Sequence, residues 1–232
     1  KGGSQFAEPF RFRRVADSLI ADLVGPEIGF GHTQLPIDFQ GGNVLVGDDF
    51  FLVGKDYLKT SEDFIERILI PSRTREPGQR VRALHRAFLD SERRLVEVGF
   101  RTDHEAVLPD AVERPFWREG RRWTEHFFRG AVRGSRQPLF HLDMFITLAG
   151  RGKSGNYRLV VGSPKLAADC LREAKVSLED MGPYQLPDHG VRQALLFDEV
   201  ADDLKSQGFE VHRSPLPLVF HDDTGRTGVV EQ

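Results

Sequence analysis

The chain has 232 residues, of which 39% are hydrophobic and 29% are charged, and its formal net charge is −3. This composition is typical of a folded domain with a sizeable core, and it argues against intrinsic disorder. The lack of a basic surplus predicts no nucleic-acid partner. No apolar run approaches the ~20 residues that span a bilayer, so we expect no membrane association. A single cysteine, Cys170, excludes an internal disulfide and is typical of a reducing compartment, which predicts a cytoplasmic location.

The first part of the chain shows one helical pattern and then patterns of short strands. Apolar residues at helical spacing predict an amphipathic helix over residues 10–24, which a Gly-Pro pair ends. An extended stretch follows, up to residue 36. Two apolar runs, residues 43–46 and 50–53, flank an Asp-Asp pair and predict a β hairpin.

The remainder of the chain alternates between helical and strand patterns. Residues 79–98 have apolar side chains on one helical face and predict a second helix. Residues 139–148 read as a buried strand, and after a glycine-rich turn residues 157–161 read as its antiparallel partner. Residues 195–207 predict a third long helix, and residues 209–213 a strand after it.

The segment 103–137 is polar and rich in arginine, and we interpret it as an insertion or a long surface connection. Its large aromatic residues have to be buried against the edge of a core, against a partner, or over a site as a lid. These residues are Phe116, Trp117, Trp123, Phe127 and Phe128.

A short pattern recurs along the chain. Three times a predicted helix ends in Gly-Phe and is followed by a strand that proline closes, beginning at Gly29, Gly99 and Gly208. Glycine is a general helix-capping residue, so chance repetition is one interpretation. The other is a fold built from repeated α/β modules.

A histidine and an aspartate stand two positions apart in the predicted strand 139–148. Residues i and i+2 of a strand share a face, so His141 and Asp143 would project together while Leu142 and Met144 fill the core. Polar residues on one face of an apolar strand meet water, a partner or a site. A solvated strand face or a structural hydrogen bond is the alternative to a functional site.

Two segments together carry a family resemblance: Phe-Gln-Gly-Gly-Asn at residues 39–43, and His-Leu-Asp at residues 141–143. In this order they resemble the guanidino-group-modifying superfamily, the pentein fold of arginine and agmatine deiminases, dimethylargininases and amidinotransferases. The resemblance implies an α/β propeller of repeated ββαβ-like modules around a pseudo-fivefold axis. We expect residues 1–232 to form one such domain, with further modules beyond both ends of this sequence.

The resemblance also implies roles for individual residues. His141 would be the general acid/base, and Asp143 would bind the guanidinium, since a carboxylate accepts two parallel hydrogen bonds from that planar cation. Asp38, Gln40 and Asn43 would bind the substrate from the other side. Gln40 stands where several members have glutamate, which weakens cation binding unless Asp38 substitutes for it. A tight turn is the alternative interpretation of this glycine-rich segment.

The expected function is therefore guanidino-group modification of the deiminase or amidinohydrolase type, or amidinotransfer, without cofactor or metal. The substrate would be arginine or an arginine derivative. Such enzymes use a late cysteine as the nucleophile. Cys170 lies in a predicted helix on one face with Leu166 and Ala174, which predicts a buried thiol, so the nucleophile would lie in an unseen segment.

Two other functions stay open at the level of sequence. One is a pentein-like binding or interaction protein without catalysis, which would hold an arginine side chain or another partner. The other is a metal-dependent hydrolase that would use His141 and Asp143 with His221 and Asp222. The sequence does not distinguish free arginine from agmatine, methylated arginine or peptidyl arginine, nor does it predict an oligomeric state.

Overall fold

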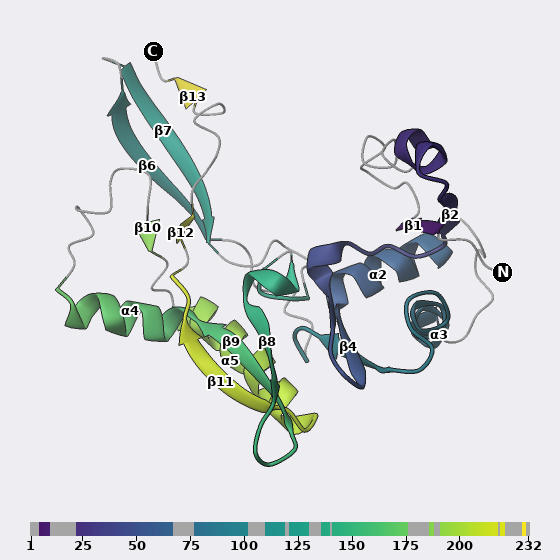
Figure 1. Ribbon diagram of the computed structural model, residues 1–232. Coiled ribbons are helices and arrows are strands. Elements are labelled where there is room, and N and C mark those ends of the chain that lie inside the picture. The colour runs from purple at the N-terminus through teal and green to yellow at the C-terminus, as the bar shows by residue number, and fades with distance from the viewer. Residues whose placement is uncertain are drawn as a thin grey trace. The chain divides into compact units, whose positions relative to one another are not determined.

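The computed structural model shows a mixed α/β protein (Figure 1) made of two compact units, Lys1–Glu97 and Val98–Gln232. It describes residues 5–9, 22–66, 77–101, 110–118, 121–129, 136–139, 141–175, 186–187, 191–217, 219–220 and 229–230. Helices alternate with small sheets, and none of the sheets in these ranges closes on itself. A mixed α/β class is therefore confirmed, while the propeller and the single domain stay predictions.

The larger sheet of unit 1 has three strands in the order β3-β4-β5. Strand β3 (Val44–Val46) pairs antiparallel with β4 (Phe50–Gly54), which confirms the predicted hairpin. Helix α2 (Lys55–Phe64) follows directly, and the third strand is β5 (Arg94–Val98). The central strand β4 is buried along its whole length, so both faces of this small sheet are covered.

The single helix predicted over residues 79–98 is wrong, because helix α3 (Pro77–Phe88) ends ten residues early and the chain continues into β5. The physical cause is a side-chain turn. Asp90 accepts hydrogen bonds from the backbone N–H groups of Glu92 and Arg93, both at 2.9 Å, which offers the backbone an alternative to the helix.

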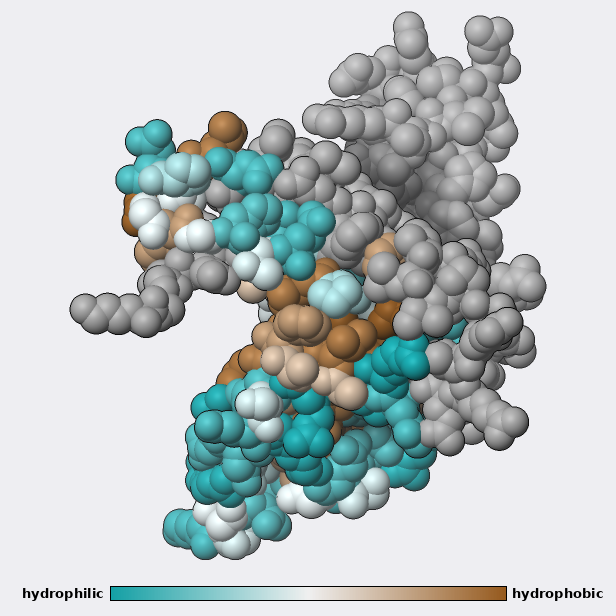
Figure 2. All heavy atoms as spheres, turned by 90° about the vertical axis from the view of Figure 1, so that its right-hand side faces the viewer, coloured by the Kyte–Doolittle hydropathy of each residue, from teal (hydrophilic) through white to brown (hydrophobic). Residues whose placement is uncertain are grey.

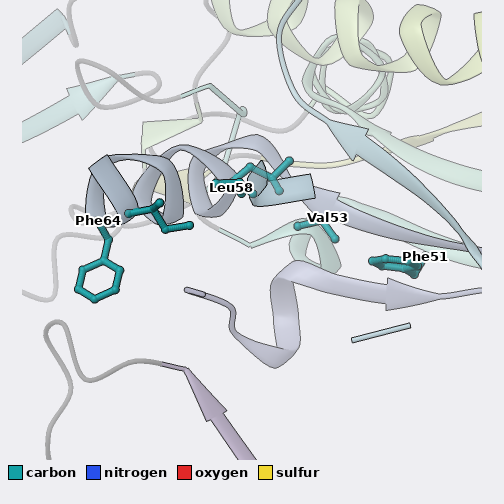
Figure 3. Close-up of a cluster of buried hydrophobic side chains, with 6 residues drawn as sticks. Phe51, Val53, Leu58 and Phe64 are labelled. Atoms are coloured by element: carbon teal, nitrogen blue, oxygen red, sulfur yellow. The ribbon is translucent and has the colours of Figure 1, made fainter. Parts of the chain in front are cut away.

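The core of unit 1 lies between β4 and the two helices (Figure 3). Phe51 and Val53 of β4 form a buried cluster with Leu58 and Phe64 of α2 and with Val81 of α3, and Val53 lies near Leu58 in the figure. Alternate residues of a strand share a face, so one face of β4 meets the helices.

Unit 1 also contains a two-stranded parallel sheet of β1 (Gln5–Pro9) and β2 (Gly31–Leu35). Most of the helix predicted over residues 10–24 lies outside the described residues. Residues 22–27 are helical, so this helix continues across the Gly-Pro pair that we expected to end it.

Unit 2 contains a second three-stranded sheet, in the order β11-β9-β8. Strand β8 (Ile146–Arg151) is antiparallel to β9 (Tyr157–Ser163), which is parallel to β11 (Glu210–Pro215). Helices α4 (Pro164–Glu173) and α5 (Val191–Ser206) connect β9 to β11. The antiparallel hairpin, the late helix and the strand that follows it are confirmed.

The core of unit 2 lies between β9 and α5. Leu159 and Val161 of β9 are fully buried, as are Phe197 and Leu204 of α5. The ring of Phe145 meets that of Phe197 edge to face, with ring centroids 5.5 Å apart. This aromatic contact joins the segment before β8 to helix α5.

The segment predicted as an insertion contains a regular hairpin. Strands β6 (Asp110–Arg118) and β7 (Arg121–Arg129) are antiparallel over their full length. The other short strands of unit 2 are β10 (Leu186–Pro187), β12 (Val219–Phe220) and β13 (Val229–Val230), of which β13 pairs with β7.

The two three-stranded sheets are built in the same way, and we call this shared arrangement the module; each unit contains one copy of it. In each unit a one-turn 3-10 helix precedes the first strand, an antiparallel second strand follows, and helices lead to a third strand beside the second. In unit 1 the N–H of Arg94 donates to Asp49 O at 3.0 Å, so β5 begins beside the start of β4. That placement matches β11 beside β9.

The predicted Gly-Phe repeat is correct at two of its three positions. Gly29 and Gly208, with φ of 72° and 95°, end helical segments and lead into β2 and β11, each of which is parallel to an earlier strand. Gly99 instead follows β5. The first and third instances are therefore alike, and the second differs from them because it follows a strand.

The face shown in Figure 2 is hydrophilic over most of its described area, and hydrophobic residues gather in a smaller part of it. Single exposed hydrophobic residues are common on folded proteins. Those of unit 1 are Leu23, Val24, Ile28, Phe30, Val46 and Phe88. In the ranges that the structure describes, no helix has the length and apolar character needed to cross a bilayer.

The core of unit 1 makes a specific stability prediction. We expect Phe51→Ala to lower the free energy of unfolding by about 3–5 kcal/mol, because it leaves a cavity between β4 and α2. Val46→Ala, on the 55% exposed Val46, should cost about 0.5 kcal/mol or less. Urea denaturation of both variants measures this difference, and equal losses would contradict the packing described here.

Candidate functional site

The predicted catalytic pair lies on a turn and not on a strand. His141 has an extended backbone (φ −125°, ψ 145°) and leads into the one-turn 3-10 helix Leu142–Met144. The N–H of Phe145 donates to Leu142 O at 3.0 Å and closes that turn. The strand expected over residues 139–148 is therefore wrong up to Phe145.

The turn changes which side chains are exposed. Met144 was expected in the core, yet it is 43% exposed, and Phe145 takes the buried position in its place. His141 is half-buried and Asp143 is exposed. The two polar residues therefore flank a buried leucine at the start of the module, and the carboxylate of Asp143 faces solvent.

The predicted binding residues of unit 1 lie on a similar turn. Gln40 has an extended backbone (φ −136°, ψ 149°) and leads into the one-turn 3-10 helix Gly41–Asn43. The N–H of Asn43 donates to Gln40 O at 2.9 Å. Asp38 and Gln40 are half-buried, whereas Asn43 is fully buried. A Cβ atom on Gly41 would meet no described atom within 4 Å, so open space adjoins the turn.

Gln40 and His141 occupy the same position in the two modules. Each has an extended backbone and stands directly before the 3-10 turn that precedes the first strand. The structure brings Asp38, Gln40 and Asn43 together in unit 1, and His141 and Asp143 together in unit 2.

Two buried polar residues next to the first turn were missed at the level of sequence. Ser61 of α2 is fully buried, and its Oγ accepts a hydrogen bond from the N–H of Asp38 at 2.8 Å. The same hydroxyl donates to Tyr57 O at 2.9 Å. No helix was predicted around Ser61 from the sequence, so nothing signalled that this hydroxyl would be buried and would require partners.

His85 of α3 is the second of these residues. Its side chain is fully buried, and Nδ1 lies 3.0 Å from Val81 O. Burial lowers the pKa of His85, against the opposing influence of the backbone oxygens of Val81 and Asp38 and of the Glu97 carboxylate. The imidazole is therefore held neutral beside the segment that carries Asp38.

The prediction that Cys170 is buried is wrong. Cys170 is exposed on α4, and Leu166 on the same helical face is 37% exposed. Helix α4 packs through Pro164 and Ala167 instead. A helix turns by about 100° per residue, so the thiol, which follows Ala167 by three residues, lies beside the packed stripe and not within it.

A metal centre is not supported by the described ranges, where no three His, Cys, Asp or Glu side chains are grouped to hold an ion. His221 and Asp222, which the alternative metal-dependent mechanism requires, lie outside the described residues. That mechanism stays a prediction.

The exposed thiol can be tested directly. Native protein should react with a thiol-specific disulfide reagent at Cys170 without denaturant, at a rate close to that of the unfolded chain, because the side chain meets solvent. Absorbance of the released chromophore measures the rate, and Cys170→Ser is the blank. A thiol that reacts only after denaturation would restore the buried interpretation.

The buried histidine predicts a pH-dependent stability. The unfolded chain binds a proton at His85 near pH 6.5, whereas the folded chain binds it only at lower pH. The contribution of neutral His85 to the free energy of unfolding should therefore be fully present above pH 6.5. It should be lost as the pH falls toward the pKa that His85 has in the folded chain. Denaturation midpoints at about pH 7.5 and about pH 5.5 measure this loss. His85→Gln should reduce the loss, and the exposed His212→Gln should leave it unchanged.

No protein-family model and no curated protein matches this chain.

Proposed function

We propose that this chain modifies guanidino groups as a pentein-type deiminase or amidinohydrolase that acts on arginine or an arginine derivative. The observation that carries the proposal is the equivalent placement of Gln40 and His141. Each of the two motifs that resemble this family places one residue, Gln40 or His141, directly before the 3-10 turn of its module. A module repeat with polar residues at one fixed position is the arrangement expected of a pentein site.

The residues of unit 2 suit the proposed chemistry. The exposed carboxylate of Asp143 is accessible to a guanidinium and can accept two parallel N–H hydrogen bonds from it. His141 stands two residues earlier and is half-buried, and imidazole exchanges protons near neutral pH. In this proposal Asp143 holds the cation while His141 transfers protons.

The proposed reaction proceeds through a covalent intermediate. A cysteine thiolate attacks the guanidinium carbon, one C–N bond breaks, and the nitrogen leaves as ammonia or an amine after receiving a proton from His141. Water then attacks the amidino-thioether carbon, the C–S bond breaks, and the thiolate returns with a ureido product. We assign this nucleophile to no residue of the chain, since Cys170 lies on an exposed helix face.

The residues of unit 1 would contact the substrate from their own turn. Asp38 supplies the negative charge, and Gln40 supplies one acceptor oxygen where related enzymes have a carboxylate. Asn43 is fully buried, so it would contribute by stabilising the turn. Its backbone N–H donates the hydrogen bond to Gln40 O that closes this turn.

A non-catalytic binding protein is the second candidate. The neutral side chain of Gln40 and the exposed position of Cys170 favour it, because a binding protein needs no thiol nucleophile and can hold an arginine side chain through the weaker contact that a neutral acceptor makes. In that case the candidate residues would bind a guanidinium without transforming it. The two candidates share the binding residues and differ only in turnover.

The first test separates catalysis from binding. With full-length protein and agmatine or arginine as the probe, His141→Ala should abolish formation of the ureido product but change the dissociation constant by less than about threefold. Asp143→Asn should weaken binding by at least about tenfold, because a charge-assisted hydrogen-bond pair is lost. His212→Ala is the matched control.

Colorimetric detection of the ureido group and titration calorimetry provide the two readouts. Full turnover by His141→Ala would contradict the proton-transfer role. If the unmodified protein bound a guanidinium tightly but formed no product, the enzyme proposal would be wrong and the binding-protein proposal would take its place.

The position of Gln40 provides a gain-of-function test. Gln40→Glu adds the carboxylate found in several related enzymes, so we expect agmatine to bind about tenfold more tightly than to the unmodified protein. Calorimetric titration measures the change. Gln79→Glu, on the exposed face of α3, adds the same charge elsewhere and should leave the affinity unchanged. Equal affinities of the two variants for agmatine would show that Gln40 does not contact the guanidinium.

A further inference from the structure

In each module a buried polar side chain forms a hydrogen bond with the backbone just ahead of the candidate site residue. In unit 1 the residue held in this way is Asp38, which stands two positions before Gln40. In unit 2 it is Leu139, which stands two positions before His141. The two hydrogen bonds therefore act at the same place in the two copies of the module.

The side chain that acts in unit 1 is Ser61 of α2, which is fully buried. Its Oγ accepts a hydrogen bond from the N–H of Asp38 at 2.8 Å and donates to Tyr57 O at 2.9 Å. A hydroxyl has one proton, and the alternative acceptor, Asp38 O, is farther away at 3.4 Å. Ser61 therefore joins the backbone of α2 to the backbone of Asp38 across 23 residues of chain.

The side chain that acts in unit 2 is Gln137, which is 1% exposed. Its Nε2 donates to Leu139 O at 2.8 Å. The segment that carries it is itself attached to the buried Phe100, whose N–H donates to Arg136 O at 2.7 Å. A side-chain amide buried to this degree requires hydrogen-bond partners, so the bond to Leu139 O is part of the core structure and not an incidental surface contact.

The 3-10 turn provides a second fixed point in each module. In unit 1 the N–H of Val44 donates to Gly41 O, and in unit 2 the N–H of Phe145 donates to Leu142 O at 3.0 Å. The extended residue directly before each turn thus stands between a held backbone group and a closed turn. Because the rotamers open to a side chain depend on its backbone φ and ψ, fixing this backbone also restricts where the side chain points.

We propose that Ser61 and Gln137 are positioning residues with the same task, which is to fix the backbone that leads into the turn and thereby the direction of Gln40 or His141. This assignment does not depend on what Gln40 and His141 bind. Its consequence for catalysis rests on the proposed function, in which Gln40 contacts the guanidinium and His141 transfers protons. Ser61 and Gln137 act only through the backbone, so neither is a catalytic residue.

Hydrogen exchange of the full-length protein, followed by NMR, tests the assignment first without any variant. The N–H of Asp38 lies outside the helices and strands, yet it should exchange at least about tenfold more slowly than in an unfolded chain, because it donates to a buried oxygen. The side-chain N–H groups of Gln137 should be slowed in the same way. Exchange of either group at its intrinsic rate would overturn the role of that residue.

Ser61→Ala removes the acceptor in unit 1. We expect exchange at Asp38 and at Val44 to become about tenfold faster, whereas Ser61→Thr keeps the hydroxyl and should keep the protection. Thr60→Ala is the matched control, because the neighbouring Thr60 hydroxyl donates to Asp56 O within the same helix. Equal exchange at Asp38 in Ser61→Ala and Thr60→Ala would contradict the assignment.

Gln137→Met removes the donor in unit 2 with a side chain of similar length. Exchange at Phe145 should become about tenfold faster, while the turn of unit 1 keeps its protection. Gln207→Met is the matched control, since the Gln207 amide donates to Asp203 at the end of α5. A loss of protection in both turns, or in neither, would overturn the role of Gln137.

Steady-state kinetics with agmatine distinguishes positioning from a loss of stability. Ser61→Ala should raise KM about tenfold with little change in kcat, and Gln137→Met should lower kcat at least about tenfold with KM within about threefold. The concentration of sites is taken from the stoichiometry of calorimetric agmatine binding, so loss of folded protein is not counted as loss of turnover. Unchanged KM and kcat per site in both variants would overturn the positioning roles.

The two readouts also separate the positioning residues from the proposed function. The expected changes in exchange, combined with no agmatine binding or turnover by the unmodified protein, would leave the positioning residues standing and overturn the proposed function. Agmatine turnover by the unmodified protein, combined with unaltered exchange in both variants, would overturn the positioning residues alone.

Discussion

The structure of each module depends on its central strand, which is buried on both faces in unit 1 and mainly on one face in unit 2. All five residues of β4 are buried, and Leu159 and Val161 of β9 are fully excluded from solvent. A strand of this kind requires a partner on each edge and a cover over its faces, because its backbone and apolar side chains cannot meet water. The preceding hairpin strand, the following helices and the third strand supply these partners, and the 3-10 turns are positioned by the pairing that results.

The candidate site residues gather at the turns where the backbone enters each sheet. Gln40 and His141 are both extended residues held at the entry to a first strand. A scaffold that is rigid behind the turn and open in front of it suits recognition of a planar cation, which needs acceptors fixed in direction. In unit 1 that rigidity has an identifiable source, since Ser61 holds the backbone of Asp38 through a buried hydroxyl. The proposed function is supported by the equivalent positions of Gln40 and His141 in the two modules.

Local sequence patterns located most of the elements but misjudged three boundaries, two of them for physical reasons that the structure shows. Residues 79–98 carry apolar side chains at helical spacing, yet Asp90 captures two backbone N–H groups and releases the chain into β5. Leu142 and Phe145 alternate neither as a strand nor as a long helix. Their burial on both sides of exposed Asp143 and Met144 requires a tight turn, which a period-two pattern does not describe.

The sequence by itself determined the two hairpins, the late helices and the motifs at residues 39–43 and 141–143, because these depend on neighbours close along the chain. Tertiary structure alone decided that Cys170 faces solvent, since the packed stripe of α4 depends on what lies against it. It also decided that Ser61 meets the backbone of Asp38 across 23 residues of chain. Contacts between distant segments leave no periodic signal in one sequence, so the residue that holds the segment before the first turn became visible only in the fold.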